Sequence, residues 1–175
     1  MSAETTLRIS AALCDRAQGI LSALKENGLS IVTAESCTAG MAAAVLSRAE
    51  GAGDVLHGGF VTYTKQHKTA ALGVSADLLR QRGAVNAEVV RQLAAGALKH
   101  SRASVSLAIS GVLGPEEDED GNPVGLVFFC CQKSGGEPIV VKEEFGKRGP
   151  EELLQLTISR AFDLIEQTIS SGRSR

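Results

Sequence analysis

The polar cluster at residues 34–40 is the part of this 175-residue chain whose residue types and placement could do chemistry. Ser36 follows the short, mostly apolar run 29–33, which is typical of a buried strand, and precedes a helix predicted over residues 39–48. A serine at such a turn lies beside unpaired backbone N–H groups, which can hold a phosphate or the oxyanion of an acyl-transfer intermediate. Capping of the helix is the commoner use of a serine or threonine such as Ser36 and Thr38, and the residues alone favour it while leaving both roles open.

Cys37 offers a second nucleophile in the same turn. A thiolate at a helix N-terminus has a lowered pKa, and His57 or His67 could act as its base. Nothing in the sequence fixes the distance between the thiol and either histidine. A small buried residue is the simpler interpretation of Cys37.

Apolar spacing and turn residues predict alternating helices and strands around this cluster. Helices are expected over residues 9–24, 39–48, 74–82, 86–100 and 150–170, and strands over residues 29–33, 58–63, 104–109, 124–132 and 138–145. Residues 110–123 are expected to form a loop. This order predicts an α/β sandwich with a mixed sheet, formed as one domain over residues 1–175, with residues 170–175 as a loose tail.

Composition excludes several classes of function. The 18 basic residues are balanced by 20 acidic ones, so the chain lacks the basic footprint of a nucleic-acid-binding protein. No secretory signal and no apolar run of membrane-spanning length is present, which predicts a cytoplasmic protein with four reduced cysteines and no membrane partner. The cysteines and histidines show no ligand spacing such as CxxC, so no metal site is expected.

Four ordered motifs resemble those of the CinA carboxy-terminal domain family. Residues 34–40 resemble the family's AESCTGG signature, and residues 58–68 its GG-x-V-T-Y-x4-K segment. Residues 72–74 and 83–85 look like its L-G-V and G-A-V, and residues 110–115 and 123–125 its TGIAGP and KPVG elements. The resemblance runs from about residue 28 to residue 129, in a chain with the length of a stand-alone member.

The resemblance implies a three-layer α/β/α sandwich with a mixed, mostly parallel sheet. It also implies a cofactor-free nicotinamide mononucleotide deamidase that releases nicotinate mononucleotide and ammonia, and a homo-oligomer. The apolar helix at residues 89–98 could pack against a second subunit. Ser36 is carried over as the nucleophile, with Lys68 and Tyr63 as its polar partners in a serine–lysine variant of the serine triad. Substrate contacts are expected at the following positions: Glu35, Cys37, Thr38, Gly40, Ser110, Gly111 and Arg148.

For Lys68 to act as a base it must be neutral, and desolvation can lower an amine's pKa by several units. Tyr63, the only tyrosine, could orient Lys68 or relay a proton. Without the resemblance, Lys68 is better explained as a solvated lysine and Tyr63 as a strand-end residue. Backbone N–H groups of Cys37 and Thr38 are the expected oxyanion donors, and the Thr38 hydroxyl could meet the phosphate or ribose.

The chain departs from the family around the expected pocket. Ala39 replaces a usual glycine, which matters if that position needs a positive φ and matters little if the helix has already begun there. Leu113 adds bulk in place of an alanine, and the acidic run 116–120 replaces a glycine-rich loop. Five carboxylates would repel a phosphate, so this run is expected to point away from the site. These departures keep open a second class of function, a catalytically weak or inactive nucleotide-binding or partner-binding paralogue.

Overall fold

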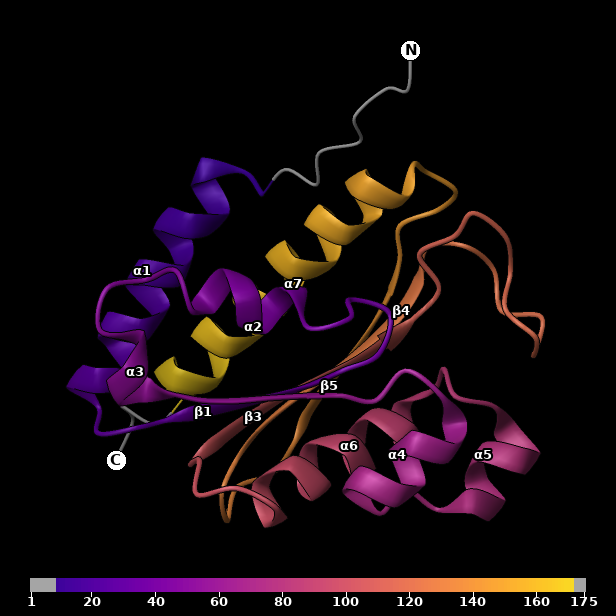
Figure 1. Cartoon of the computed structure of the whole chain (residues 1–175), viewed down its shortest axis with the longest axis horizontal. Helices are drawn as coiled ribbons and strands as arrows, with labels where there is room; N and C mark the ends of the chain where they lie inside the picture. The colour runs from indigo at the N-terminus through magenta and orange to yellow at the C-terminus, as the bar shows by residue number, and fades with distance from the viewer. Residues whose placement is uncertain (1–8, 172–175) are drawn as a thin grey trace.

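A five-stranded mixed sheet runs between two layers of helices in the computed structural model, which describes residues 9–171 (Figure 1). The strands are β1 (Ile31–Glu35), β2 (Leu56–Val61), β3 (Val105–Gly111), β4 (Leu126–Lys133) and β5 (Ile139–Glu144). The helices are α1 (Ala11–Glu26), α2 (Met41–Leu46), α3 (Ala52–Val55), α4 (Lys65–Leu72), α5 (Ala76–Arg82), α6 (Ala87–Lys99) and α7 (Pro150–Ser170). Residues 172–175 of the predicted tail lie outside the described residues.

The strand order β2-β1-β3-β4-β5 explains where a site can form. Strands β2, β1 and β3 are parallel, whereas β4 runs antiparallel to β3 and β5 antiparallel to β4. Glu35, the last residue of β1, is level with Val61 of β2 and Ile109 of β3. The carboxyl ends of the three parallel strands therefore meet at one edge of the sheet, where ligands usually bind in open α/β folds.

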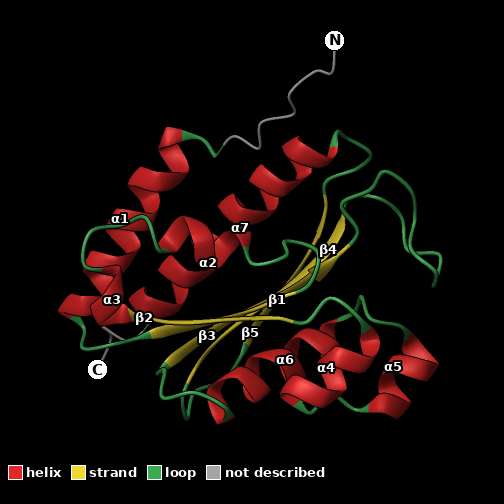
Figure 2. Cartoon of the chain, in the orientation of Figure 1, coloured by secondary structure: helices red, strands yellow, loops and turns green. Residues whose placement is uncertain are grey.

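Each face of the sheet is buried by its own helical layer, which confirms the predicted three-layer sandwich. Helices α1, α2 and α7 cover one face, and α4, α5 and α6 cover the other (Figure 2). The neighbours Cys130 and Cys131 illustrate the alternation, because they belong to the two opposite cores. All four cysteines are free thiols.

The apolar face of α6 packs on this chain's own sheet, so the expectation that residues 89–98 meet a second subunit is wrong for that face. Val89, Val90 and Leu93 are completely buried against strand residues such as Val32 and Ala108. Packing within this chain therefore explains the apolar face of α6 that had suggested an interface.

Helix α2 begins two residues later than predicted, and the reason lies in the backbone. Ala39 has a φ of +48° and Gly40 a φ of +91°, so the chain passes through the left-handed region before the helix starts at Met41. Ala39 therefore occupies the kind of position that favours glycine, and its helix propensity does not help it. Helix α7, by contrast, has the predicted bounds, with Pro150 in its first turn and acidic residues beside it.

Two helices were not predicted, α3 and α4, and α4 matters for function. Thr64 caps it, its Oγ1 accepting a hydrogen bond from His67 N (3.1 Å), and Gly73 ends it with a φ of +72°. Both signals are visible in the sequence as a threonine and a glycine around an eight-residue segment. Among the helices of residues 9–171, none has the length and apolar character to cross a membrane.

Candidate active site

Ser36 directly follows β1 and is held in line with the sheet. Its N–H donates to the carbonyl of Ile109 in β3 (3.0 Å), and its own carbonyl accepts from Ala39 N (3.0 Å). These two bonds close a tight turn that leaves the side chain 8% exposed. The predicted strand-to-helix position of Ser36 is therefore found, at the edge where the parallel strands end.

Lys68 meets Ser36 from the opposite helical layer. Its side chain, on α4, is completely buried, and Nζ lies 2.8 Å from Ser36 Oγ. Two carbonyls complete its surroundings, those of Thr62 (2.7 Å) and Tyr63 (3.2 Å) in the segment after β2. The interpretation of Lys68 as a solvated lysine is thus wrong, because α4 carries it into the interior.

Burial changes the charge state that Lys68 can adopt. Desolvation lowers the pKa of its ammonium from 10.5 to about 8, and the nearby Cys37 thiol opposes this shift. A neutral amine has two N–H groups and one lone pair. The Thr62 and Tyr63 carbonyls can take the two N–H groups, which leaves the lone pair for the Ser36 hydroxyl.

Tyr63 takes part in this arrangement through its backbone. Its carbonyl accepts from Lys68, while its side chain is 67% exposed and lines the cavity described below. Within residues 9–171 the phenol hydroxyl forms no hydrogen bond, so no direct link from it to Ser36 or Lys68 exists in this structure.

Glu35 lies beneath the turn and is completely buried. Its carboxylate accepts hydrogen bonds from the hydroxyls of Thr33 (2.9 Å) and Thr38 (2.6 Å) and from the N–H groups of Ala42 (3.0 Å) and Ala43 (2.9 Å). It thereby caps α2, whose own N-cap residue has no side chain. Glu35 is accordingly a positioning residue in this structure and is absent from the cavity wall, so its predicted substrate contact has no support in this geometry.

Two other predicted substrate contacts, Gly40 and Thr38, differ in how they lie relative to the cavity. Gly40 also stays off the cavity wall, where its left-handed backbone starts α2 beside Val61. Thr38 does line the cavity, but its hydroxyl donates to Glu35 and is not free to donate to a phosphate or ribose.

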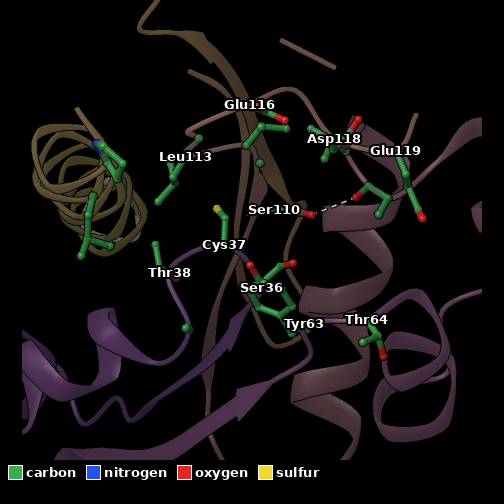
Figure 3. Close-up of a pocket in the computed structure, with 18 of the residues that line it drawn as sticks. Ser36, Cys37, Thr38, Tyr63, Thr64, Ser110, Leu113, Glu116, Asp118 and Glu119 are labelled. Atoms are coloured by element: carbon green, nitrogen blue, oxygen red, sulfur yellow. Dashed lines mark hydrogen bonds between the residues drawn. The ribbon is translucent and has the colours of Figure 1, made fainter. Parts of the chain in front are cut away.

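A cavity of about 1090 Å³ opens directly beside Ser36 (Figure 3). Of the predicted site residues, it brings together the following: Ser36, Cys37, Thr38, Tyr63, Ser110 and Gly111. Ser110 and Gly111 belong to β3 and not to the predicted loop, and Ser110 Oγ donates to the carbonyl of Ala84 (2.8 Å), the dashed line in Figure 3. Leu113 lines the cavity as expected.

Cys37 is a poor alternative nucleophile. Its side chain packs against the apolar core, and desolvation raises the pKa of the thiol to about 12. Neither His57 nor His67 lines the cavity, and both are exposed on their elements. Neither histidine therefore accompanies this thiol in the way that Lys68 accompanies Ser36.

The acidic run faces the cavity, contrary to the expectation that it would point away. Glu116, Asp118 and Glu119 lie along one side of the cavity in Figure 3, and Asp120 also lines it. The physical reason is Lys65 at the start of α4, whose ammonium binds Glu119 (2.8 Å) and Asp120 (2.7 Å). These two ion pairs hold the acidic run beside the cavity.

Arg148 does not line the cavity in this structure, and its substrate contact stays a prediction. Its guanidinium binds Glu152 (2.6 Å) and the carbonyl of Phe145 (3.0 Å). The start of α7 lines the cavity instead, through Pro150, Glu151 and Leu154. Sequence reasoning also missed Lys65 as a lining residue.

In residues 9–171, no three His, Cys, Asp or Glu side chains gather as metal ligands.

Fold and geometry together define an α/β/α sandwich protein with a buried serine–lysine pair at the carboxyl edge of its parallel strands, an arrangement suited to acyl transfer. The chain belongs to the CinA C-terminal domain family, whose model matches residues 14–169. This confirms the family that the sequence motifs predicted.

Known relatives support the family assignment both by their sequences and by a solved structure. The nicotinamide-nucleotide amidohydrolase PncC of Escherichia coli is 42% identical over 123 residues, 70% of this chain and 74% of that protein. A CinA-like protein of Mycolicibacterium vanbaalenii is 44% identical over 146 residues, 83% of this chain but 34% of that longer protein. The crystal structure of the competence/damage inducible protein CihA from Agrobacterium tumefaciens superposes with a TM-score of 0.85 at 31% identity, covering 99% of this chain and 100% of that one.

Proposed function

We propose that this protein is an amidohydrolase that converts nicotinamide mononucleotide into nicotinate mononucleotide and ammonia. The observation that carries the proposal is the 2.8 Å separation of Lys68 Nζ and Ser36 Oγ beside a substrate-sized cavity. The name of the 42% identical relative, a nicotinamide-nucleotide amidohydrolase, supports the choice of substrate.

The proposed reaction has two halves. Neutral Lys68 removes the proton from Ser36 as Oγ bonds to the carboxamide carbon, giving a tetrahedral oxyanion. The Lys68 ammonium then returns that proton to the amide nitrogen, which leaves as ammonia while an ester to Ser36 forms. A water molecule, deprotonated by Lys68, attacks this ester, and the ammonium protonates Ser36 Oγ as nicotinate mononucleotide departs.

The oxyanion needs hydrogen-bond donors that do not already donate to another acceptor. Within the described residues, the N–H groups of Cys37 and Thr38 make no backbone hydrogen bond, and both residues line the cavity beside Ser36. These two N–H groups are our proposed oxyanion hole. Tyr63 contributes its carbonyl, which orients Lys68, and its exposed phenol is placed to contact the substrate.

The test is ammonia release from nicotinamide mononucleotide by the wild-type protein and two matched pairs of variants. Ser36→Ala should lower kcat at least about a thousandfold, because the covalent bond cannot form. Ser47→Ala, an exposed serine at the end of α2, serves as its control. Lys68→Met should lower kcat by at least about a hundredfold, with the exposed Lys99→Met as control. Wild-type protein without turnover would defeat the proposal.

A catalytically weak or inactive paralogue is the second candidate, because the carboxylates that line the cavity would weaken productive binding of a phosphate-bearing substrate. In that case nicotinamide mononucleotide would raise the melting temperature of the protein without releasing ammonia. The two measurements made on one sample separate the candidates.

The remaining parts of the proposal concern organisation. We assign residues 1–175 to one domain, supported by the packing of α1 against α7, and we expect a homo-oligomer in the cytoplasm, where the free cysteines would stay reduced. Light scattering coupled to size exclusion measures the oligomeric state directly. A monomer at micromolar concentration would contradict the oligomer.

A further inference from the structure

We infer that Ser110 is a specificity-determining residue whose hydroxyl oxygen accepts a hydrogen bond from the N–H group of the reacting carboxamide. The inference rests on the proposed function for the identity of the reacting group, and it adds how the site distinguishes the amide substrate from the carboxylate product. It follows from the position of Ser110 beside Ser36 and from the hydrogen bond that its hydroxyl donates.

Ser110 is the neighbour of Ser36 on the adjacent strand. In the parallel pair of β1 and β3, Glu35 is level with Ile109, and Ser36 N continues the ladder by donating to the Ile109 carbonyl (3.0 Å). Ser110 is therefore level with Ser36, roughly 5 Å away across the two strands. Both residues line the cavity and are labelled at its wall in Figure 3.

The side chains of Ser36 and Ser110 face the helical layer that contains α4 and α6. Two positions earlier in the strands, Ala34 and Ala108 belong to the core beneath that layer, and strand side chains return to the same face at every second residue. Lys68 reaches Ser36 Oγ from α4 on this side. The serine nucleophile, its lysine and the Ser110 hydroxyl therefore share one side of the sheet edge.

The Ser110 hydroxyl can only accept a hydrogen bond from a ligand. Its single hydrogen is donated to the Ala84 carbonyl (2.8 Å), and a carbonyl cannot donate in return. Among the hydrogen bonds of residues 9–171, none has Ser110 Oγ as its acceptor, although the residue is only 1% exposed. The lone pairs of this buried oxygen are available to an N–H group in the cavity.

The carbonyl that takes the hydrogen of Ser110 is itself held in place. Ala84 N donates to Asp120 (3.3 Å), and Asn86 Nδ2 donates to the neighbouring Gly83 carbonyl (3.1 Å). Asn86 in turn caps α6, so this turn is fixed to a long helix. The orientation of the Ser110 hydroxyl is therefore set by the fold before any ligand binds.

The reacting carboxamide fits between these groups. With its oxygen at the proposed N–H donors of Cys37 and Thr38, in the turn toward α2, its nitrogen faces the side on which Lys68 and Ser110 lie. One N–H then donates to Ser110, and the nitrogen stays open to the proton from Lys68. The product carboxylate has no N–H to donate, and its oxygen would meet the lone pairs of Ser110. Ser110 therefore shifts the relative affinity toward the amide.

Binding to variants that cannot form the acyl-enzyme tests this preference apart from turnover. In the Ser36→Ala background, calorimetric titrations give the Kd of nicotinamide mononucleotide and that of nicotinate mononucleotide. Adding Ser110→Ala should raise the Kd of the amide without raising that of the acid. The ratio of the two Kd values should move toward the acid by at least about fivefold, the effect of one neutral hydrogen bond.

Ser106→Ala in the same background is the matched control. Ser106 is a completely buried serine on the same strand and the same face, and it lies outside the cavity wall. Its replacement should leave the ratio unchanged. Ser110→Thr keeps the hydroxyl, and the family's motif has a threonine at this position, so this variant should keep the ratio within about twofold.

Turnover gives a second readout that a purely structural defect would not move in the same way. In the protein with Ser36 intact, Ser110→Ala should lower kcat/KM for ammonia release by at least about fivefold. The Ki of nicotinate mononucleotide, relative to the KM of the substrate, should fall at the same time. A structural defect would instead weaken the binding of both nucleotides.

An unchanged Kd ratio in Ser110→Ala, the same shift in Ser106→Ala, an equal loss in Ser110→Thr, or no binding of either nucleotide would overturn the inference. Failure of the proposed function is read separately, as absent ammonia release from nicotinamide mononucleotide by the wild-type protein.

Discussion

Lys68 Nζ lies 2.8 Å from Ser36 Oγ, although Ser36 follows β1 and Lys68 lies on α4, 32 positions further along the chain. The lysine is fully buried, and burial lowers its pKa to about 8. A serine hydroxyl and an amine that can lose its proton near neutral pH are the two groups that an acyl-transfer reaction needs first. This pair is the centre of the proposed mechanism.

The first prediction concerns the pH dependence of turnover. Because the active form of Lys68 is the neutral amine, kcat/KM for ammonia release should rise about tenfold per pH unit below its pKa of about 8 and level off above it. Steady-state rates between pH 6 and 10 test this. A rate that is flat or falling through pH 8 would contradict a lysine base.

The second prediction concerns stability. The pKa of Lys68 is lower in the folded protein than in the unfolded chain, so the unfolded chain binds more protons between about pH 8 and 10.5. The free energy of unfolding should therefore rise with pH across this window, by about 2 kcal/mol relative to Lys68→Met.

Denaturant titrations of both proteins at about pH 7 and pH 10 measure this difference. The comparison with Lys68→Met is necessary because the pKa values of the Cys37, Cys130 and Cys131 thiols are raised to about 12, which acts in the opposite direction. Those thiols are present in both proteins, so their effect cancels. If the free energy of unfolding varied with pH in the same way in both proteins, the lowered pKa of Lys68 would be refuted.

The third prediction uses the left-handed backbone of Ala39. Replacing it with glycine removes the steric cost of a φ of +48°, and Ala39→Gly should leave the free energy of unfolding unchanged or raise it by up to about 1 kcal/mol. The matched control is Ala44→Gly, an exposed position within α2, which should lower it by about 0.5–1 kcal/mol. Equal destabilisation by both would argue against the left-handed assignment.

The fourth prediction concerns Glu35. Its carboxylate accepts four hydrogen bonds, and an amide in its place would turn N–H groups toward donors. Glu35→Gln should therefore cost about 2 kcal/mol of stability and lower turnover through the displaced turn. Glu50→Gln, an exposed glutamate, is the control. Wild-type stability in Glu35→Gln would remove its positioning role.

Local sequence signals predicted much of the fold. Helix α7 was predicted to its last residue, because Pro150, the acidic first turn and the apolar spacing are all local. The position of Ser36 at the end of a buried strand was local as well. The choice of Lys68 as its partner came from the family resemblance, since α4 has to pack before that lysine is buried.

The orientation of the acidic loop could not be predicted from local patterns. A run of carboxylates normally faces water, and here the Lys65–Asp120 pair across 55 positions turns it over the cavity. Arg148 shows the converse case, since the i,i+4 contact with Glu152 takes it away from the site. Both outcomes depend on which opposite charge lies nearest in the folded chain.

The central claim is that Ser36 forms a covalent acyl-enzyme, and mass spectrometry of protein quenched during turnover of nicotinamide mononucleotide tests it most directly. The proposed mechanism predicts a mass increase equal to the nicotinate mononucleotide acyl group on the peptide that contains Ser36. The increase should persist in Cys37→Ala and disappear in Ser36→Ala together with ammonia release. An adduct that survives in Ser36→Ala, or undiminished turnover in that variant, would contradict the account.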